Sequence, residues 1–149
     1  MKTRAELEAA IERGEPLKYL FFWGHTPRAD GQLSPSCLSQ WWPATFREGD
    51  DTFASAEHYM MAGKARLFGD EGSRARILAA DHPGEAKRLG RGVAGFDGAR
   101  WDAARFELVV QANYLKFKQN SPLLAFLLAT GARVLVEASP VDRIWGIGL

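Results

Sequence analysis

The order of strand-like and helix-like segments constrains the fold of this chain more than any other feature of its sequence. Two apolar stretches with β-forming aromatic residues come first, at 17–23 and at 41–46, the second interrupted at Pro43. Helical patterns fill residues 55–129, and one β-branched stretch follows at 134–137. Because strands and helices do not alternate, the order excludes a sheet built from βαβ units. It predicts an α+β fold with a helical majority.

Local signals set the expected boundaries of the helices. Ser55 is a candidate N-cap, Pro83 and Pro122 suit first-turn positions, and Gly131 suits a helix exit. The predicted helices cover 3–13, 55–68, 71–80, 83–89, 99–119 and 122–129. Loops or turns are expected at 24–39, 48–51 and 142–149, and the last of these also suits a bent strand.

The length and the charge balance limit the class of protein. A chain of 149 residues with 46% hydrophobic residues predicts one globular domain over 1–149, with residues 1–16 as a helical extension. The net charge of +1 argues against a duplex-binding protein held mainly by phosphate contacts. Basic residues nevertheless exceed acidic ones in 64–105, which leaves a local anionic ligand open.

The single cysteine and the termini bear on the compartment. Cys37 has no intrachain partner, which is natural in a reducing environment. Residues 1–16 carry several glutamates and no apolar core, so we expect no signal peptide there. The apolar run at 123–129 is far shorter than the roughly 20 residues of a membrane span. We therefore expect a soluble cytoplasmic protein that does not engage a membrane.

The sequence motifs support neither a dinucleotide-binding loop nor a metal site. The run GRGVAG at 90–95 matches the spacing of a dinucleotide-binding loop, but a helical pattern precedes it where a strand is required. The simpler interpretation is a glycine-ended helix that leads into a turn. His25, His58 and His82 lack partners at metal-ligand spacing, so we expect no metal site.

The predicted helix 55–68 holds the clearest candidate for catalysis. Glu57 and Lys64 are two turns apart, with Met60 and Met61 between them on that face. If the face lines a cleft, burial raises the pKa of the carboxyl and lowers that of the amine, which gives an acid/base group and a nucleophile. A surface charge pair on an amphipathic helix is the alternative.

A second candidate cluster lies at 142–148. Its glycines allow a backbone to approach a ligand, Trp145 offers a flat surface for stacking, and Asp142 offers a carboxylate. A terminal strand with a core tryptophan and a capping aspartate explains the same residues. Trp101, at the start of a long helix, suits the core when it is taken alone.

Taken together, these stretches resemble the NADAR family of YbiA-like N-glycosidases over about residues 17–149. The motifs that carry the resemblance are LSQWW at 38–42, FASAEHYMMAGKA at 53–65, LFGD at 67–70, AKRLGRGV at 86–93, Trp101, KFKQN at 116–120, LLATG at 127–131 and DRIWGIG at 142–148. Ser39-Gln40-Trp41 departs from the common Ser-Asn-Phe pattern. Relatives continue past the Trp-Gly-x-Gly motif into a last helix, so this chain is expected either to be shortened or to close its pocket in another way.

The resemblance implies a mainly helical α+β domain that hydrolyses the N-glycosidic bond of a phosphorylated ribose. Phosphoribosylamino-pyrimidine intermediates of riboflavin synthesis and ADP-ribose on guanine bases, free or in DNA, are the substrate classes it implies. The catalytic residues implied are Glu57, Lys64 and Asp142; the substrate-binding residues are Trp23, Gln40, Trp42, Arg91, Trp101, Trp145 and Gly146. No metal or organic cofactor is required.

Two routes fit this chemistry. In one, Glu57 and Asp142 share the proton transfer and charge stabilisation while water attacks the sugar. In the other, Lys64 forms a Schiff base with the opened sugar. A non-catalytic module that binds ADP-ribose or NAD is the alternative function, and a protein-interaction domain with its tryptophans in core and rim is a third.

Overall fold

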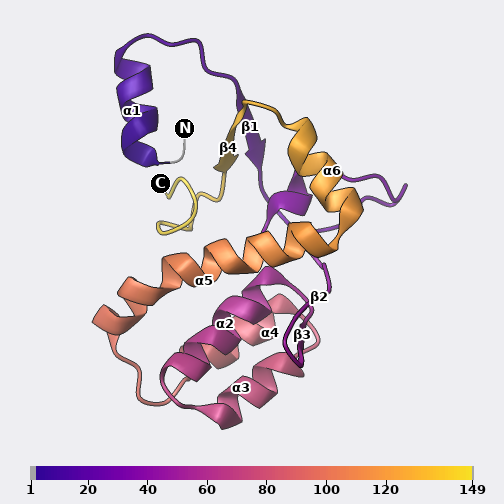
Figure 1. Ribbon diagram of the computed structural model, residues 1–149, viewed down its shortest axis with the longest axis vertical. Helices are drawn as coiled ribbons and strands as arrows, with labels where there is room; N and C mark the ends of the chain where they lie inside the picture. The colour runs from indigo at the N-terminus through magenta and orange to yellow at the C-terminus, as the bar shows by residue number, and fades with distance from the viewer. Residues whose placement is uncertain (1–2, 149) are drawn as a thin grey trace.

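The computed structural model describes residues 3–148. Its helices are α1 (Arg4–Glu12), α2 (Ala56–Leu67), α3 (Glu71–Leu78), α4 (Pro83–Arg91), α5 (Gly98–Gln119) and α6 (Ser121–Ala129), with a 3₁₀ helix η1 (Pro35–Leu38). Its strands are β1 (Tyr19–Phe22), β2 (Phe46–Glu48), β3 (Asp51–Phe53) and β4 (Val134–Glu137). The long helix α5 crosses the molecule, with α2, α3 and α4 on one side and α6 and the β1–β4 pair on the other (Figure 1). The α+β class with a helical majority is confirmed.

The helix boundaries follow from capping. The N-cap side chain of each of five helices accepts the backbone N–H three residues on, and these caps are Thr3, Ser55, Asp70, His82 and Asp97. Such caps satisfy donors that have no partner within the helix. The predicted strand at 134–137 is also found, and residues 142–148 form no strand, in line with the loop expected there. Leu149, the end of that expected segment, lies outside the described residues.

The second strand was predicted at the wrong place. Residues 39–42 form a turn closed by the hydrogen bond from the Trp42 N–H to the Ser39 carbonyl, and the antiparallel pair β2–β3 begins only at Phe46, which pairs with Phe53. Pro43 has no N–H for a strand ladder. Gly49, with a φ of +58°, makes the turn between the two strands, so the expected turn at 48–51 is shorter and has strands on both sides.

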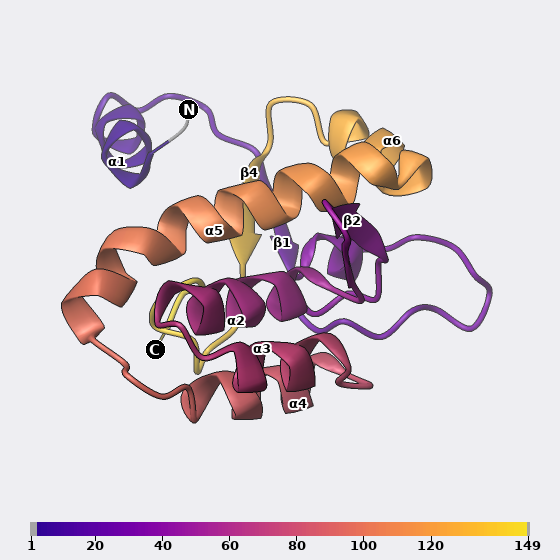
Figure 2. The ribbon, with the colours of Figure 1, turned by 60° about the horizontal axis from the view of Figure 1, so that its bottom comes forward.

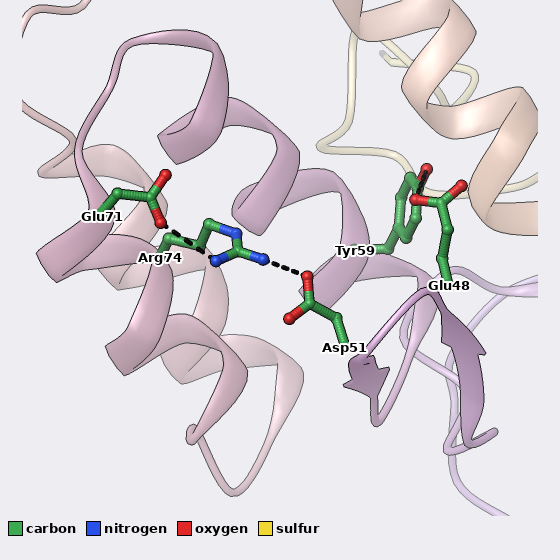
Figure 3. A network of polar contacts seen from close by, with 5 residues as sticks. All are labelled: Glu48, Asp51, Tyr59, Glu71 and Arg74. Carbon is green, nitrogen blue, oxygen red and sulfur yellow. Dashed lines mark hydrogen bonds and ion pairs between the residues drawn. The ribbon is translucent and has the colours of Figure 1, made fainter.

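Polar contacts tie this hairpin to the helices (Figure 3). The Tyr59 hydroxyl donates a 2.9 Å hydrogen bond to Glu48, which joins β2 to α2. Arg74 of α3 pairs with Asp51 of β3 and, at 3.1 Å, with Glu71. The hairpin therefore contacts both α2 and α3.

Helix α2 lies at the centre of the larger hydrophobic core. Every residue from 56 to 65 is buried, so α2 has no solvated face along this stretch. Gly63 and Gly90 allow the close packing: a Cβ at Gly63 would lie 2.7 Å from Leu108 of α5, and one at Gly90 would collide with Met61. The structure thus excludes the surface charge pair as the explanation of Glu57 and Lys64.

Strands β1 and β4 pair in parallel, with Tyr19 opposite Val134 and Phe22 opposite Glu137. In parallel strands the carboxyl ends share one edge, so the segments that leave β1 and β4 emerge side by side. The segment after β4 turns back toward α2, as the yellow trace in Figure 2 shows. Helix α1 lies apart from the other helices in both views (Figures 1 and 2).

Candidate active site

A cavity of about 890 Å³ lies where the segments after β1 and β4 meet α2, α4 and the start of α5. Eight of the residues that the sequence singled out line it: Trp23, Gln40, Glu57, Lys64, Arg91, Trp101, Asp142 and Trp145. They come from six separate parts of the chain, so the fold, and not local sequence, brings them together.

Two of the expected substrate-binding residues do not line this cavity. Trp42 is 5% exposed and packs in the smaller core with Cys37 and Phe117. Gly146 lies behind the wall, where a Cβ would sit 2.8 Å from the Ser139 carbonyl oxygen and 2.9 Å from that of Asp142. The glycine therefore serves the close packing of the backbone at this turn.

Glu57 is the most unusual group in the cavity. The Ser55 cap places it in the first turn of α2, where its N–H donates a 3.1 Å hydrogen bond to the Gln40 carbonyl. The side chain is 3% exposed, and among the described residues its Oε1 has no hydrogen-bond partner. Burial raises the pKa of Glu57 to about 7, against the opposing effects of Lys87 and Trp41. A carboxyl in this state donates a proton near neutral pH.

Lys64 lies two turns further along α2 and is 9% exposed. Its Nζ donates a 2.8 Å hydrogen bond to the Gly90 carbonyl and lies 4.3 Å from the centre of the Phe96 ring and 5.4 Å from Trp101. Burial lowers the pKa of the amine. Met60 completes the apolar lining between Lys64 and Glu57.

The cavity also contains three cations. Lys87 and Arg91, from successive turns of α4, form no ion pair among the described residues, whereas Arg105 of α5 pairs with Asp102 at 3.1 Å. The Lys87 ammonium lies 5.6 Å from the Trp41 ring and the Arg105 guanidinium 6.0 Å from Trp145. Cations beside aromatic faces suit a ligand that has both phosphates and a planar base.

Asp142 has a structural task in the segment after β4. Its Oδ1 accepts hydrogen bonds of 2.9 Å from the N–H groups of both Ile144 and Trp145. This turn fixes the direction in which the Trp145 side chain enters the cavity wall. The helix cap that the sequence offered as an alternative role for Asp142 is not found, because residues 142–148 form no helix; the carboxylate holds a turn instead, and the residue lines the cavity as well.

Sequence reasoning missed Glu137, at the carboxyl end of β4. It lines the cavity together with Glu57, and it also lines a second, mostly apolar cavity of about 680 Å³ beside it. Gln40 and Trp145 line both cavities too, so these three residues form the wall between them. In the sequence, the one signal for Glu137 was its position at the end of a predicted strand. Such a position indicates a ligand site only when the parallel partner strand is known.

A buried lysine holds the loop that carries Gln40. Lys116 is 0% exposed, and its Nζ donates hydrogen bonds of 2.7 Å to the Cys37 carbonyl and 2.8 Å to that of Ser39. Burial lowers the pKa of Lys116 to about 8. Gln40, which follows Ser39 in the chain, has a buried side-chain Oε1 with no hydrogen-bond partner among the described residues. Like the Glu57 oxygen, it is an acceptor available to a ligand.

Residues 3–148 contain no cluster of histidine, cysteine or carboxylate side chains that could hold a metal ion. Within the same range, no helix has the length and apolar character needed to cross a membrane. The GRGVAG run ends α4 at Arg91, with Gly95 in a turn at a φ of +69°, so it is not a dinucleotide-binding loop.

Comparison with known proteins identifies the family to which the chain belongs. The model of the NADAR domain matches residues 21–149. N-glycosidase R617 of Acanthamoeba polyphaga mimivirus is 44% identical over 89% of this chain and 79% of its own length. A riboflavin biosynthesis protein of Vibrio vulnificus is 33% identical over 74% of this chain but only 29% of its own length.

A solved structure agrees with the sequence matches. The NMR structure of the E. coli protein YbiA superposes with a TM-score of 0.71 at 28% identity, over 87% of this chain and 71% of that one. The family match covers both the α2 helix with Glu57 and the segment that carries Trp145. The chain belongs to the NADAR family.

Proposed function

We propose that this protein is an N-glycosidase that hydrolyses the bond between a phosphorylated ribose and the nitrogen of a base. The observation that carries the proposal is the state of Glu57: a buried carboxyl with an unpaired oxygen and a pKa of about 7, facing a large cavity. Breaking an N-riboside requires a proton for the leaving nitrogen, and a carboxylic acid with a raised pKa supplies it.

The rest of the cavity suits the two ends of such a substrate. Arg91 and Lys87 offer cations for the phosphate, and Arg91 can bind it in a bidentate manner. Trp145 and Trp101 offer flat surfaces for the base and the sugar. Lys64 lines the cavity, and because burial lowers the pKa of its amine, it can act as a nucleophile.

The names of the relatives support this class of substrate. Two of the similar proteins are named N-glycosidases and two are named riboflavin biosynthesis proteins. Phosphoribosylamino-pyrimidine intermediates are therefore the first substrates to test, and ADP-ribosylated guanine, free or in DNA, is the second class. The buried free thiol of Cys37 suits a reducing compartment such as the cytoplasm.

The test is direct release of the base. Wild-type protein and Glu57→Gln are incubated with phosphoribosylamino-pyrimidine and with ADP-ribosylated guanosine, and free base and sugar are separated by chromatography. We expect release from one of the two classes by the wild type, at least 100-fold slower with the variant. Tight binding of ADP-ribose without release from either substrate would favour a non-catalytic binding module.

A further inference from the structure

We propose that Glu137 is the second catalytic carboxylate of this cavity and that Asp142 is a positioning residue for Trp145. The inference rests on the proposed N-glycosidase function and names the groups that divide its proton transfers. It replaces the pairing of Glu57 with Asp142 that the sequence favoured.

The position of Glu137 follows from the sheet. As the last residue of β4 it lies opposite Phe22, at the edge where both parallel strands end. Its side chain is part of the wall between the polar cavity and the apolar one, together with Gln40 and Trp145. A substrate that places its sugar beside the basic residues and its base against the aromatic ones would bring the scissile bond to this wall.

The carboxylate of Glu137 is uncommitted, unlike that of Asp142. Within the described residues it makes no hydrogen bond and no ion pair, although it is half-buried. Asp142 already accepts the N–H groups of Ile144 and Trp145, and moving its carboxylate to a substrate would release that turn. Asp142 is therefore held in place through its Oδ1, whereas neither carboxylate oxygen of Glu137 has a hydrogen-bond partner among the described residues.

The charges around the two carboxyls of Glu57 and Glu137 bear on their protonation. Burial raises the pKa of Glu137, the charge of Asp142 raises it further, and Lys87 opposes both. The negative charge of Glu137 in turn contributes to the raised pKa of Glu57. Glu57 can therefore supply the proton, while Glu137 in its ionised form accepts one.

The division of roles balances the hydrolysis. The bond between the anomeric carbon and the base nitrogen breaks, its electron pair stays on the nitrogen, and the nitrogen takes the proton of Glu57. A water molecule adds its oxygen to the sugar carbon and gives a proton to the Glu137 carboxylate. The same base serves if water attacks an imine formed on Lys64.

The experiment compares Glu137→Gln, Glu137→Ala and Asp142→Asn with the wild type, and uses Glu107→Gln on the exposed side of α5 as the control. Thermal unfolding, kcat and KM are measured for each. We expect Glu137→Gln to lower kcat by about 10²–10⁴-fold with KM and unfolding temperature little changed. Formate, a small carboxylate, is expected to restore part of the activity of Glu137→Ala, which a structural role would not allow.

Asp142→Asn is expected to keep kcat, KM and the unfolding temperature close to those of the wild type, because the amide oxygen can still accept the N–H groups of Ile144 and Trp145 and hold the turn. The proposal is overturned if Glu137→Gln keeps kcat within a few-fold, or if formate has no effect on Glu137→Ala. If Glu137→Gln does not fold, Glu137→Asp, which keeps the charge on a shorter side chain, takes its place with the same expected loss. The wild type is assayed first, so an inactive wild type refutes the N-glycosidase function, whereas an active one leaves the result to bear on Glu137 alone.

Discussion

The Nζ atom of Lys64 donates a 2.8 Å hydrogen bond to the carbonyl oxygen of Gly90, and this contact joins the last turn of α2 to the last turn of α4. No carboxylate in the described chain forms an ion pair with this ammonium. It is held by one carbonyl and by the faces of Phe96 and Trp101. Because none of these partners carries a full negative charge, burial lowers the pKa of Lys64.

The covalent route predicts that Lys64 can be trapped. The free amine would condense with the aldehyde of the opened sugar and release water, and borohydride added during turnover would reduce the imine to a stable amine. Peptide mapping is expected to find the sugar on Lys64. Lys64→Arg should be inactive yet still bind product, since arginine keeps the charge but forms no imine. Lys18→Arg, at an exposed position, is the control.

An active Lys64→Arg without any adduct in the wild type would refute the covalent route. Direct attack of water, with Glu57 as the acid, would then be the mechanism. The two results separate because the trapping experiment needs only the wild type, whereas the substitution needs only an activity assay.

Gly90→Ala tests the packing that positions the Gly90 carbonyl, which accepts the hydrogen bond from Lys64. The new Cβ would collide with Met61, and overpacking of this kind costs about 1–3 kcal/mol, which exceeds the helix-propensity gain of up to about 1 kcal/mol. We expect a lower unfolding temperature and a loss of turnover, because the Gly90 carbonyl shifts. Gly72→Ala, exposed in α3 with only the Asp70 carboxylate 3.7 Å away, should be neutral or stabilising. Equal effects at the two glycines would contradict this account.

The sequence predicted those features that depend on neighbours along the chain. Ser55 correctly predicted the start of α2. The spacing from Glu57 to Lys64 predicted that both lie on one face of one helix, and both line the cavity. The strand at 134–137 and the helix ends near 119 and 129 also follow from local pattern. These signals act over a few residues, so single-sequence reasoning can use them.

Features that depend on distant pairing could not be predicted in the same way. The parallel match of Phe22 with Glu137 joins residues more than a hundred positions apart, and it alone brings Glu137 into the cavity. Trp42 was predicted to bind the substrate but packs in the smaller core, whereas its neighbour Trp41 lines the cavity. Which of the two adjacent tryptophans faces a ligand depends on the turn at 39–42, whereas the sequence predicted a strand from residue 41.

Glu57→Gln is expected to lower activity and to change how stability depends on pH. In the wild type, kcat/KM should fall as pH rises through about 7, where the acid loses its proton. Between pH 4.5 and about 7 the folded state binds a proton that the unfolded state has released, so stability declines as pH rises. Above pH 7 the free energy of unfolding has fallen by about 3 kcal/mol through this effect.

The glutamine side chain carries no charge and avoids that cost. Denaturant unfolding should therefore find Glu57→Gln more stable than the wild type at pH 8, with the difference shrinking toward pH 4.5. A variant that is less stable than the wild type at pH 8 would show that the carboxylate is stabilised by its surroundings and is not the buried acid inferred here.

Trp145→Ala is expected to weaken ligand binding more than it weakens the fold. The ring lies in the wall between the two cavities and is only partly buried. Stacking of an aromatic side chain on a base is worth about 1–3 kcal/mol, which corresponds to roughly 5–150-fold in Kd. Calorimetric titration with a ribose phosphate and a thermal melt measure the two effects. A collapse of the melting temperature would instead assign Trp145 to the core.

Arg91→Ala tests whether the last turn of α4 recognises phosphate. Arg91 lines the cavity, whereas Arg88 on the same helix does not and has a side chain that is 70% exposed. Loss of Arg91 should lower the affinity for phosphorylated sugars and leave that for the unphosphorylated nucleoside unchanged, because only the phosphate can accept both of its N–H groups. Arg88→Ala removes the same charge from the same helix and should leave both affinities unchanged. If both variants weaken binding equally, the general positive charge of α4 attracts the ligand and Arg91 makes no specific contact with the phosphate.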